Sequence, residues 1–191
     1  SNSLYKSSFN NLCNILRQFI AFTPILQFGG GESFLYKDFL SLLQKIKEFG
    51  LKCKVSTNGV FLNEQIAEEI IEDELFTEIH ISIDGIGSLH DEIRGVPGTF
   101  DKVINNIESL LRLRKQLNKR KIILRINCVI TKYNFNKLNE IYNFFNNYDI
   151  DEIAFMHNLF CTEKMLEKHN KEFLNTEYFF SYTRGGEYSN D

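Results

Sequence analysis

The feature that most constrains this chain is a regular alternation of strand-like and helix-like segments. Five short apolar segments predict strands, at residues 25–28, 51–57, 76–84, 122–131 and 151–157. Apolar residues at helical spacing fill the segments between them, and another helical pattern precedes the first strand. Strands joined in this way through helices run parallel and are connected by right-handed crossovers. The sequence therefore predicts an α/β fold built on one parallel sheet.

Local sequence signals predict where several helices begin and end. Gly50 is placed to end the helix that follows the first strand. Asn63 and Thr99 are predicted N-cap residues, because their side chains can accept a hydrogen bond from the first helical turn. The segment 85–98, between the third strand and Thr99, is predicted to be a loop. Toward the C-terminus the pattern is weak, and only a helix around 163–175 is expected.

The order of elements favours a barrel over a dinucleotide-binding sheet. Because the series begins on a helix, we expect a strand to be missing before residue 1, and Ser1-Asn2 resembles the remnant of a purification tag. Gly29-Gly30-Gly31-Glu32 lacks the GxGxxG spacing of a Rossmann fold. The predicted fold is a partial (β/α) TIM-like barrel with parallel strands, truncated at the N-terminus. We expect residues 1–157 to form this core and residues 158–191 to be an incomplete C-terminal extension.

The composition excludes several classes of partner. The 191 residues carry a formal net charge of −3, so no basic surface points to a nucleic-acid partner. The apolar runs are too short for a membrane-spanning helix. Four cysteines lie far apart without a CxxC pair, which predicts reduced thiols and a cytoplasmic location: Cys13, Cys53, Cys128 and Cys161.

Three of the predicted strands carry a polar face. By the two-residue period of a strand, one face is formed by Cys53, Val55 and Thr57, by Ile79, Ile81 and Ile83, and by Leu124, Ile126 and Cys128. The opposite face is polar and consists of Lys54, Ser56 and Asn58, of His80, Ser82 and Asp84, and of Arg125 and Asn127. Buried without partners, such groups would cost about 1–3 kcal/mol each, which favours a wet or ligand-filled lumen. They cluster at the carboxyl ends of the strands, where barrels carry their active sites. The alternative is a sheet with one solvated face, which is rare in parallel sheets.

Four motifs lie in series at or beyond these strand ends. They are Phe28-Gly29-Gly30-Gly31-Glu32-Ser33, Ser56-Thr57-Asn58-Gly59, Ser82-Ile83-Asp84-Gly85 and, with Gly98-Thr99-Phe100 after it, His90-Asp91-Glu92-Ile93-Arg94-Gly95. In this order and spacing they resemble the motifs of radical S-adenosylmethionine (SAM) enzymes, over about residues 20–157. The resemblance is nearest to the branch that contains molybdenum-cofactor enzymes, sulfatase-maturating enzymes and peptide-modifying enzymes.

The resemblance implies cofactors and a reaction. Family members hold a [4Fe–4S] cluster at the mouth of a partial (β/α)6 barrel, and the cluster reduces SAM to methionine and a 5′-deoxyadenosyl radical. The radical abstracts a hydrogen atom from the substrate, so the family acts as oxidoreductases and maturases. The cofactors supply the radical chemistry and the protein supplies orientation. The substrate implied here is unknown, with a peptide or protein as the candidate.

The resemblance also assigns SAM-binding candidates. They are Gly30, Gly31, Glu32, Ser56, Asn58, Ser82, Asp84, Arg94, Asn127 and Met156. The two glycines would let the backbone approach the methionyl end of SAM, and Glu32 would accept from its ammonium group. Structural alternatives stay open: a turn role for Asp84, a solvated loop position for Arg94, and an internal pair with Asp84 or Glu32 for Arg125 and Asn127.

One departure from the family pattern concerns the cluster. The CxxxCxxC motif that supplies three thiolates does not occur in these 191 residues, and Ser33 stands where the family usually has proline. Since that motif precedes the family's first helix, we expect the cluster ligands to lie in a missing N-terminal segment of a parent protein. This chain would then hold no catalytic residue and no metal ligand, and would be inactive alone. The alternative is a degenerate barrel that binds a small molecule or a protein partner without catalysis.

The first strand predicts an exposed sheet edge. If a preceding strand is missing, unpaired backbone groups lie beside Ile25, Leu26 and Phe28. We expect this edge to recruit a second copy of the chain and form a dimer, or to be covered by the aromatic-rich segment 178–180.

Overall fold

The core of the protein is one parallel sheet. The computed structural model describes residues 9–119 and 121–157. Its strands pair in chain order, each parallel to its neighbour: β1 (Ile25–Phe28), β2 (Lys52–Thr57), β3 (Glu78–Ser82), β4 (Ile123–Ile130) and β5 (Glu152–His157). The predicted α/β fold with parallel strands is confirmed, and the strand bounds differ from the predicted ones by at most two residues.

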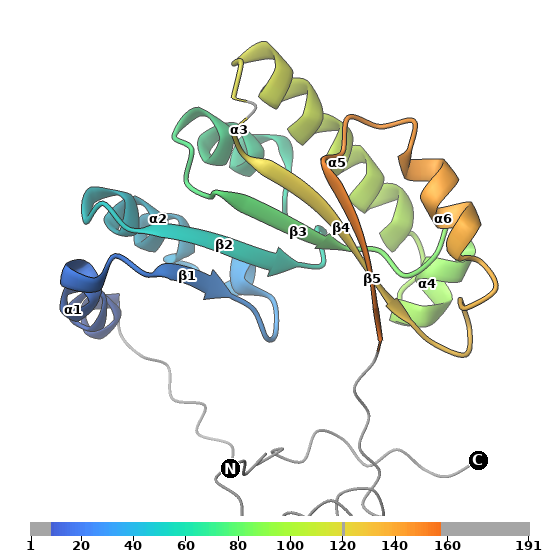
Figure 1. Cartoon of the computed structure of the whole chain (residues 1–191), viewed down its shortest axis with the longest axis horizontal. Coiled ribbons are helices and arrows are strands. Elements are labelled where there is room, and N and C mark those ends of the chain that lie inside the picture. The colour runs from blue at the N-terminus through green and yellow to red at the C-terminus, as the bar shows by residue number, and fades with distance from the viewer. Residues whose placement is uncertain (1–8, 120, 158–191) are drawn as a thin grey trace, which may run out of the picture. The chain divides into compact units, whose positions relative to one another are not determined.

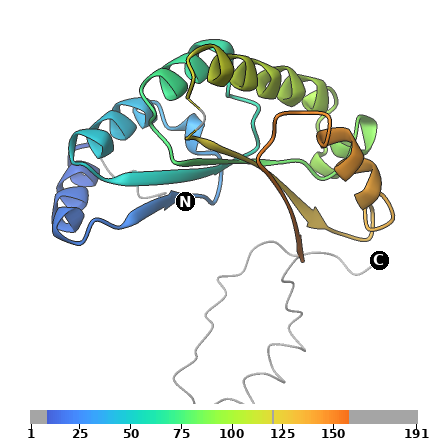
Figure 2. The ribbon, with the colours of Figure 1, turned by 45° about the horizontal axis from the view of Figure 1, so that its top comes forward.

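The helices gather on one face of this sheet. They are α1 (Phe9–Phe19), α2 (Phe39–Glu48), α3 (Glu64–Glu72), α4 (Ser88–Arg94), α5 (Thr99–Gln116) and α6 (Leu138–Phe145), with short 3-10 turns η1 (Ile20–Phe22) and η2 (Ser33–Leu35). Figures 1 and 2 show α2, α3, α5 and α6 side by side over the same face. Among the described residues no helix covers the opposite face, which we call the open face. None of the described helices is both long and apolar enough to cross a membrane.

The two-residue alternation of the strands is confirmed. Val55, Ile81 and Ile126 are at most 1% exposed and pack in the core between sheet and helices. The strand register aligns Val55 with Ile79 and Leu124 across β2, β3 and β4, and Ile81 with Ile126 across β3 and β4, so the apolar side chains form rows. Cys53 and Cys128 lie on the same side, at 1% and 0% exposure. Hydrophobic burial on this face is the main source of stability for such a fold.

The predicted cap of α5 is wrong. Thr99 is the first residue of the helix, and its hydroxyl donates to the Val96 carbonyl oxygen at 2.7 Å. The first turn is capped by Asp91, whose carboxylate accepts from the backbone N–H groups of Gly98 (2.6 Å) and Phe100 (2.8 Å). These bonds stabilise the carboxylate and lower the pKa of Asp91, with the Phe100 bond the largest cause.

The segment 85–98 is also more ordered than predicted. It contains α4, which ends at Gly95 in the left-handed conformation (φ +70°) that favours glycine. By contrast the predicted cap at Asn63 is confirmed, because its side chain accepts from the Ile66 N–H at 3.0 Å. The helix expected around 163–175 lies outside the described residues.

Strand β1 forms one edge of the sheet. Among the described residues it pairs only with β2, and Ile25 is 57% exposed, as the predicted open edge requires. The segment 178–180, proposed to cover this edge, lies outside the described residues. Dimer formation stays a prediction. Backbone contacts divide the chain into residues 1–157 and 158–191, and the first of these units contains every described element.

Candidate functional site

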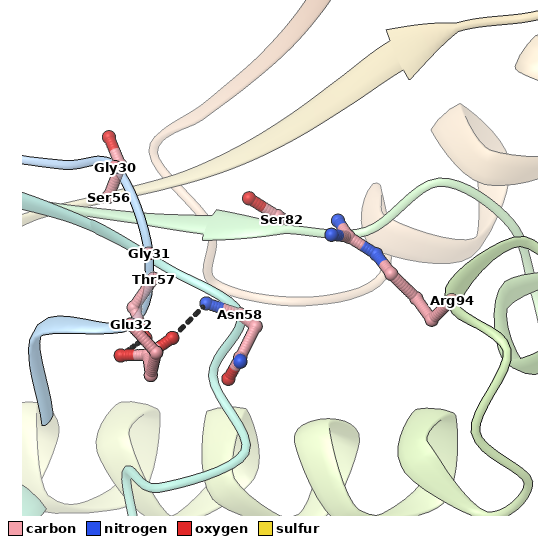
Figure 3. Close-up of a pocket in the computed structure, with 8 residues that line it drawn as sticks. All are labelled: Gly30, Gly31, Glu32, Ser56, Thr57, Asn58, Ser82 and Arg94. Carbon is pink, nitrogen blue, oxygen red and sulfur yellow. Dashed lines mark hydrogen bonds between the residues drawn. The ribbon is translucent and has the colours of Figure 1, made fainter. Parts of the chain in front are cut away.

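A pocket of about 290 Å³ opens at the carboxyl ends of β1, β2 and β3. It is lined by Gly30, Gly31, Glu32, Ser56, Thr57, Asn58, Ser82 and Arg94. Figure 3 shows these residues arriving from three strand ends and from α4. Most of the predicted binding residues therefore converge; the exceptions are Asp84, Asn127 and Met156.

On one side of the pocket, Glu32 ties the glycine loop to β2. One carboxylate oxygen, Oε1, accepts from the Thr57 hydroxyl at 2.8 Å and from the Phe34 N–H at 3.3 Å. The other, Oε2, accepts from the Asn58 N–H at 2.8 Å. Gly30 has φ +96°, which only glycine adopts readily. The loop after β1 is thus held in a defined shape beside β2.

Thr57 was not predicted as a site residue. Alternation assigns its side chain to the helix side, where it is 2% exposed. At the end of β2, however, its hydroxyl reaches Glu32 and also accepts from the Gly59 N–H at 3.1 Å. Its position within the Ser56-Thr57-Asn58-Gly59 motif is the one sequence signal that pointed to it.

Ser82 and Asn127 are neighbours across β3 and β4. They are register partners on the open face of the sheet. The Asn127 Oδ1 atom is buried and has no hydrogen-bond partner in the described part of the chain. A buried acceptor without a donor is costly, so this atom is suited to receive a donor from a bound molecule.

On the other side of the pocket, Arg94 is held by Asp84. The Arg94 guanidinium donates to Asp84 Oδ2 at 2.9 Å, while Asp84 Oδ1 accepts from the Val129 N–H at 2.8 Å. Asp84 is 6% exposed and both its oxygens have protein partners. Arg94 is thus ion-paired while its side chain stays 31% exposed, and Asp84 supports the segment after β3 without lining the pocket.

Two further buried residues support this turn, and neither was predicted for it. Asn134 is fully buried and donates through Nδ2 to the carbonyl oxygens of Asp84 and Val129, each at 2.8 Å. His90 is 1% exposed, and its Nδ1 accepts from the Asp84 N–H at 3.2 Å. Burial and the nearby Arg94 charge lower the pKa of His90 from 6.5 to about 4.

Deeper on the open face lies a row of charged pairs. Glu78 accepts from His80 Nε2 at 2.7 Å and lies 3.7 Å from Lys54 Nζ. The His80 hydrogen bond is the main reason that the pKa of Glu78 is lowered. Arg125 pairs with Glu152, so the alternative of a pair with Asp84 or Glu32 is wrong for Arg125.

Met156 lies apart from the pocket lining. It is on β5 opposite Val129 and is 39% exposed. Its predicted contact with a cofactor stays a prediction.

The described residues do not fit a [4Fe–4S] cluster. They contain no group of three histidine, cysteine or acidic side chains placed to hold a metal ion. Burial raises the pKa of Cys53 and of Cys128 to about 12, which disfavours the thiolate that a cluster needs. Cys161 lies outside the described residues.

A family model for the radical SAM superfamily matches residues 4–145, most of the chain. The chain belongs to the radical SAM superfamily. It is therefore a member of a family of enzymes, and the partial barrel with parallel strands is the family's fold.

Curated relatives of this radical SAM chain include heme-forming enzymes. It is 35% identical over 120 residues to an AdoMet-dependent heme synthase of Oleidesulfovibrio alaskensis, covering 62% of this chain and 29% of that enzyme. It is 29% identical over 135 residues to an Fe-coproporphyrin III synthase of Methanosarcina barkeri, covering 71% of this chain and 32% of that enzyme. The match thus spans about a third of the length of these relatives.

Among solved structures, the radical SAM chain resembles SuiB of Streptococcus suis. The TM-score is 0.69 at 19% identity, over 92% of this chain and 42% of SuiB. The chain also matches two further structures of SuiB, one bound to S-adenosylmethionine and one bound to the precursor peptide SuiA. At this identity the likeness concerns the fold.

Proposed function

We propose that the pocket binds SAM and that the chain is the SAM-binding core of a radical SAM enzyme. The observation that carries the proposal is the convergence of Gly30, Ser56, Ser82 and Arg94 on one pocket at the carboxyl ends of the strands. Its volume, about 290 Å³, is at the lower end of the range for small-molecule sites and the pocket is open to one side.

The polar groups of the pocket suit the two ends of SAM. The methionyl carboxylate is the natural partner of Arg94, since guanidinium–carboxylate hydrogen bonds are charge-assisted. Gly30 and Gly31 leave room for close backbone approach, because a Cβ atom added at either position would meet nothing within 4 Å beyond the adjacent residues. Glu32 already accepts three hydrogen bonds from the protein, so its contribution toward an ammonium group is its charge and the loop shape that it fixes.

The open face offers acceptors for the ammonium and ribose groups. Asn127 Oδ1 lacks a donor among the described residues, and a ribose hydroxyl or the ammonium group would supply one. Ser82 lies beside it in register, and Ser56 lies on the next strand toward β1. When bound to a reduced cluster, SAM supplies the radical that the family uses. The role of this chain is to bind and orient SAM and to exclude water around it.

The substrate is proposed to be a peptide. The support is the likeness of this fold to SuiB, which is matched in complex with its precursor peptide, while the named heme-forming relatives give a porphyrin as the second candidate. A substrate screen with one peptide and one porphyrin, scored by protection of the chain from proteolysis in the presence of SAM, compares the two classes directly.

Isothermal titration of the 191-residue chain with SAM tests the binding proposal. We expect measurable binding, and at least about tenfold weaker binding for Arg94→Met and for Asn127→Ala, because each loses a hydrogen bond to a charged or buried group. Matched controls are Asn105→Ala and Ser41→Ala, at exposed positions on α5 and α2, which should bind like the wild type. No binding by the wild type at millimolar SAM, or equal binding by all variants, would contradict the proposal.

We also propose that the cluster ligands lie outside these 191 residues. Anaerobic reconstitution tests this second part of the proposal. We expect no stoichiometric iron and sulfide on the 191-residue chain, because it contains no CxxxCxxC motif. In addition, the thiols of Cys53 and Cys128 are buried and hard to ionise. A stable cluster with one sulfide per iron would show that this part is wrong, whatever the outcome for SAM.

A further inference from the structure

His90 is a buried polar residue that the pocket does not use directly. It lies on α4, is 1% exposed and is not among the residues that line the pocket. Its ring packs against Phe100 of α5, with 6.0 Å between the ring centroids. Within the described part of the chain it accepts a hydrogen bond from the backbone N–H of Asp84. A buried polar group with such a specific partner calls for a role beyond filling space.

The partner, Asp84, is fixed from every side. His90 Nδ1 accepts its N–H, Asn134 Nδ2 donates to its carbonyl oxygen, and the Val129 N–H donates to its Oδ1. The remaining oxygen, Oδ2, is left for the Arg94 guanidinium at 2.9 Å. The orientation of Arg94 in the pocket therefore depends on the position of one carboxylate, and His90 is one of the three groups that hold the residue carrying it.

The helix geometry completes this connection. His90 and Arg94 are four residues apart on α4, so they lie on the same side of the helix. His90 anchors the first part of the helix to the turn after β3, and Arg94 returns to the carboxylate of the same turn. Both side chains of α4 therefore contact the same residue, Asp84.

We propose that His90 is a positioning residue, which holds Asp84 and through it sets the Arg94 guanidinium in the pocket. The inference rests on the proposed SAM-binding function, because it assigns His90 a part in recognising the ligand carboxylate. His90 itself touches no ligand. Its contribution to binding passes entirely through Arg94.

The hydrogen bond requires a neutral imidazole. Nδ1 can accept from the Asp84 N–H only when it carries no proton. Protonation would place a Nδ1–H donor opposite the N–H donor of Asp84, and the hydrogen bond would be lost. The charged or titratable groups around the ring are Arg94, Asp84 and Asp91, with the Cys128 thiol of β4 beyond Asp84. Burial and Arg94 keep the ring neutral at pH 7, in agreement with its lowered pKa.

A double-mutant cycle on SAM affinity tests the proposal. We expect His90→Leu to weaken binding about 5- to 30-fold, and Arg94→Met to weaken it at least as much. Because His90 acts through Arg94, the double variant should bind no more than about twofold weaker than Arg94→Met alone. If the losses of affinity in the two single variants multiply in the double variant, the proposal is overturned, since His90 would then support the pocket by packing alone. Glu92→Ala, at an exposed position on the same helix, is the matched control.

A second pair of variants serves if His90→Leu does not fold. The amide of His90→Asn places an oxygen near the position of Nδ1, whereas that of His90→Gln places it one bond further. We expect His90→Asn to bind SAM within about threefold of the wild type and His90→Gln to bind like the loss variant. The reverse order, or equal affinity, would overturn the proposal.

A readout without ligand separates this inference from the proposed function. The Nε–H resonance of Arg94 in a proton–nitrogen NMR spectrum reports the orientation of its guanidinium. We expect it to shift or broaden in His90→Gln and in Asp84→Asn, and to stay unchanged in Glu92→Ala and His90→Asn. If the wild type does not bind SAM but these shifts occur, the proposed function fails and the positioning role stands. An unchanged Arg94 signal in His90→Gln would overturn the positioning role itself.

Discussion

The two faces of the sheet differ in what they hold. On the helix side, Val55, Ile79 and Leu124 are fully buried and make an apolar row across three strands. On the open face, polar residues alternate with them, from the pairs around Glu78 up to Ser82 and Asn127; most are partly exposed, and His80 is buried. The same strands therefore provide stability with every second residue and binding groups with the others.

This division separates two kinds of mutational effect. A substitution on the helix side removes packing from a dense core, and the loss appears in the free energy of unfolding. A substitution on the open face removes a group that contacts solvent or is available to a ligand, and the loss appears in the affinity for that ligand. The predictions below compare the two faces, beginning with the largest expected effect.

The strongest comparison uses two neighbouring residues of β3. Ile81→Ala should lower the free energy of unfolding by about 2–5 kcal/mol, because Ile81 is 1% exposed and a cavity would be left. Ser82→Ala, one residue on and on the open face, should change it by less than about 0.5 kcal/mol. Urea denaturation of both variants measures the difference. Similar losses would show that the two faces contribute alike to stability.

The second prediction concerns His90, a titratable side chain on the helix-covered side. Its folded-state pKa of about 4 lies below the unfolded value of 6.5, so unfolding takes up a proton between these values. The related stability is fully present above pH 6.5 and is lost as the pH falls toward 4, by about 3 kcal/mol in total. Unfolding curves measured from pH 7 to pH 4 should fall more steeply for the wild type than for His90→Asn. Parallel curves would show that His90 titrates normally.

The third prediction concerns the turn after β2. Gly59 has φ +78°, and a Cβ atom there would lie 2.9 Å from side-chain atoms of Ile81 and Val103. Gly59→Ala should therefore cost roughly 1–3 kcal/mol through backbone strain and overpacking. Gly98→Ala is the matched control, since Gly98 has φ +76° but nothing within 4 Å. If the two variants lose equal stability, backbone strain alone explains the effect and the helix-side packing is looser than these distances indicate.

The smallest effect is expected for the charged pairs of the open face. Lys54→Met removes the partner of Glu78 at 3.7 Å, in a pair whose side chains are 27% and 21% exposed. We expect less than about 0.5 kcal/mol, because partly solvated ion pairs contribute little. A thermal melt in low and high salt measures it. A loss above about 1 kcal/mol, the upper end for such pairs, would mean that this face also holds the fold together.

The sequence predicted the parts of the fold and site that follow from short-range periodicity. Alternation along β2 and β3 placed Ser56 and Ser82 on the open face and Val55 and Ile81 in the core, and both are confirmed. The strand ends then brought Glu32 and Arg94 to one pocket, because parallel strands end at the same edge of the sheet. What these residues bind remains a proposal.

Contacts across long sequence separations could not be predicted in this way. Asn134 lies 50 residues from Asp84, and nothing in its local sequence indicates that it supports that turn. The error at Thr99 has a different origin: Asp91 lies only seven to nine residues from the N–H groups of Gly98 and Phe100 that it caps, but the turn at Gly95 and Gly98 that brings it back to them does not follow from helical periodicity. Thr57 was missed because alternation describes a strand and does not describe its last residue, where the chain turns.

The three hydrogen bonds accepted by Glu32 have a consequence for the thermodynamics of binding. A glycine-rich loop normally samples many conformations, and a ligand that selects one of them loses part of its affinity to the entropy of ordering the loop. Here the loop after β1 is already fastened to Thr57 and Asn58 before any ligand arrives. That entropy is lost when the chain folds, so this side of the pocket is preorganised and the ligand meets a receptor of fixed shape.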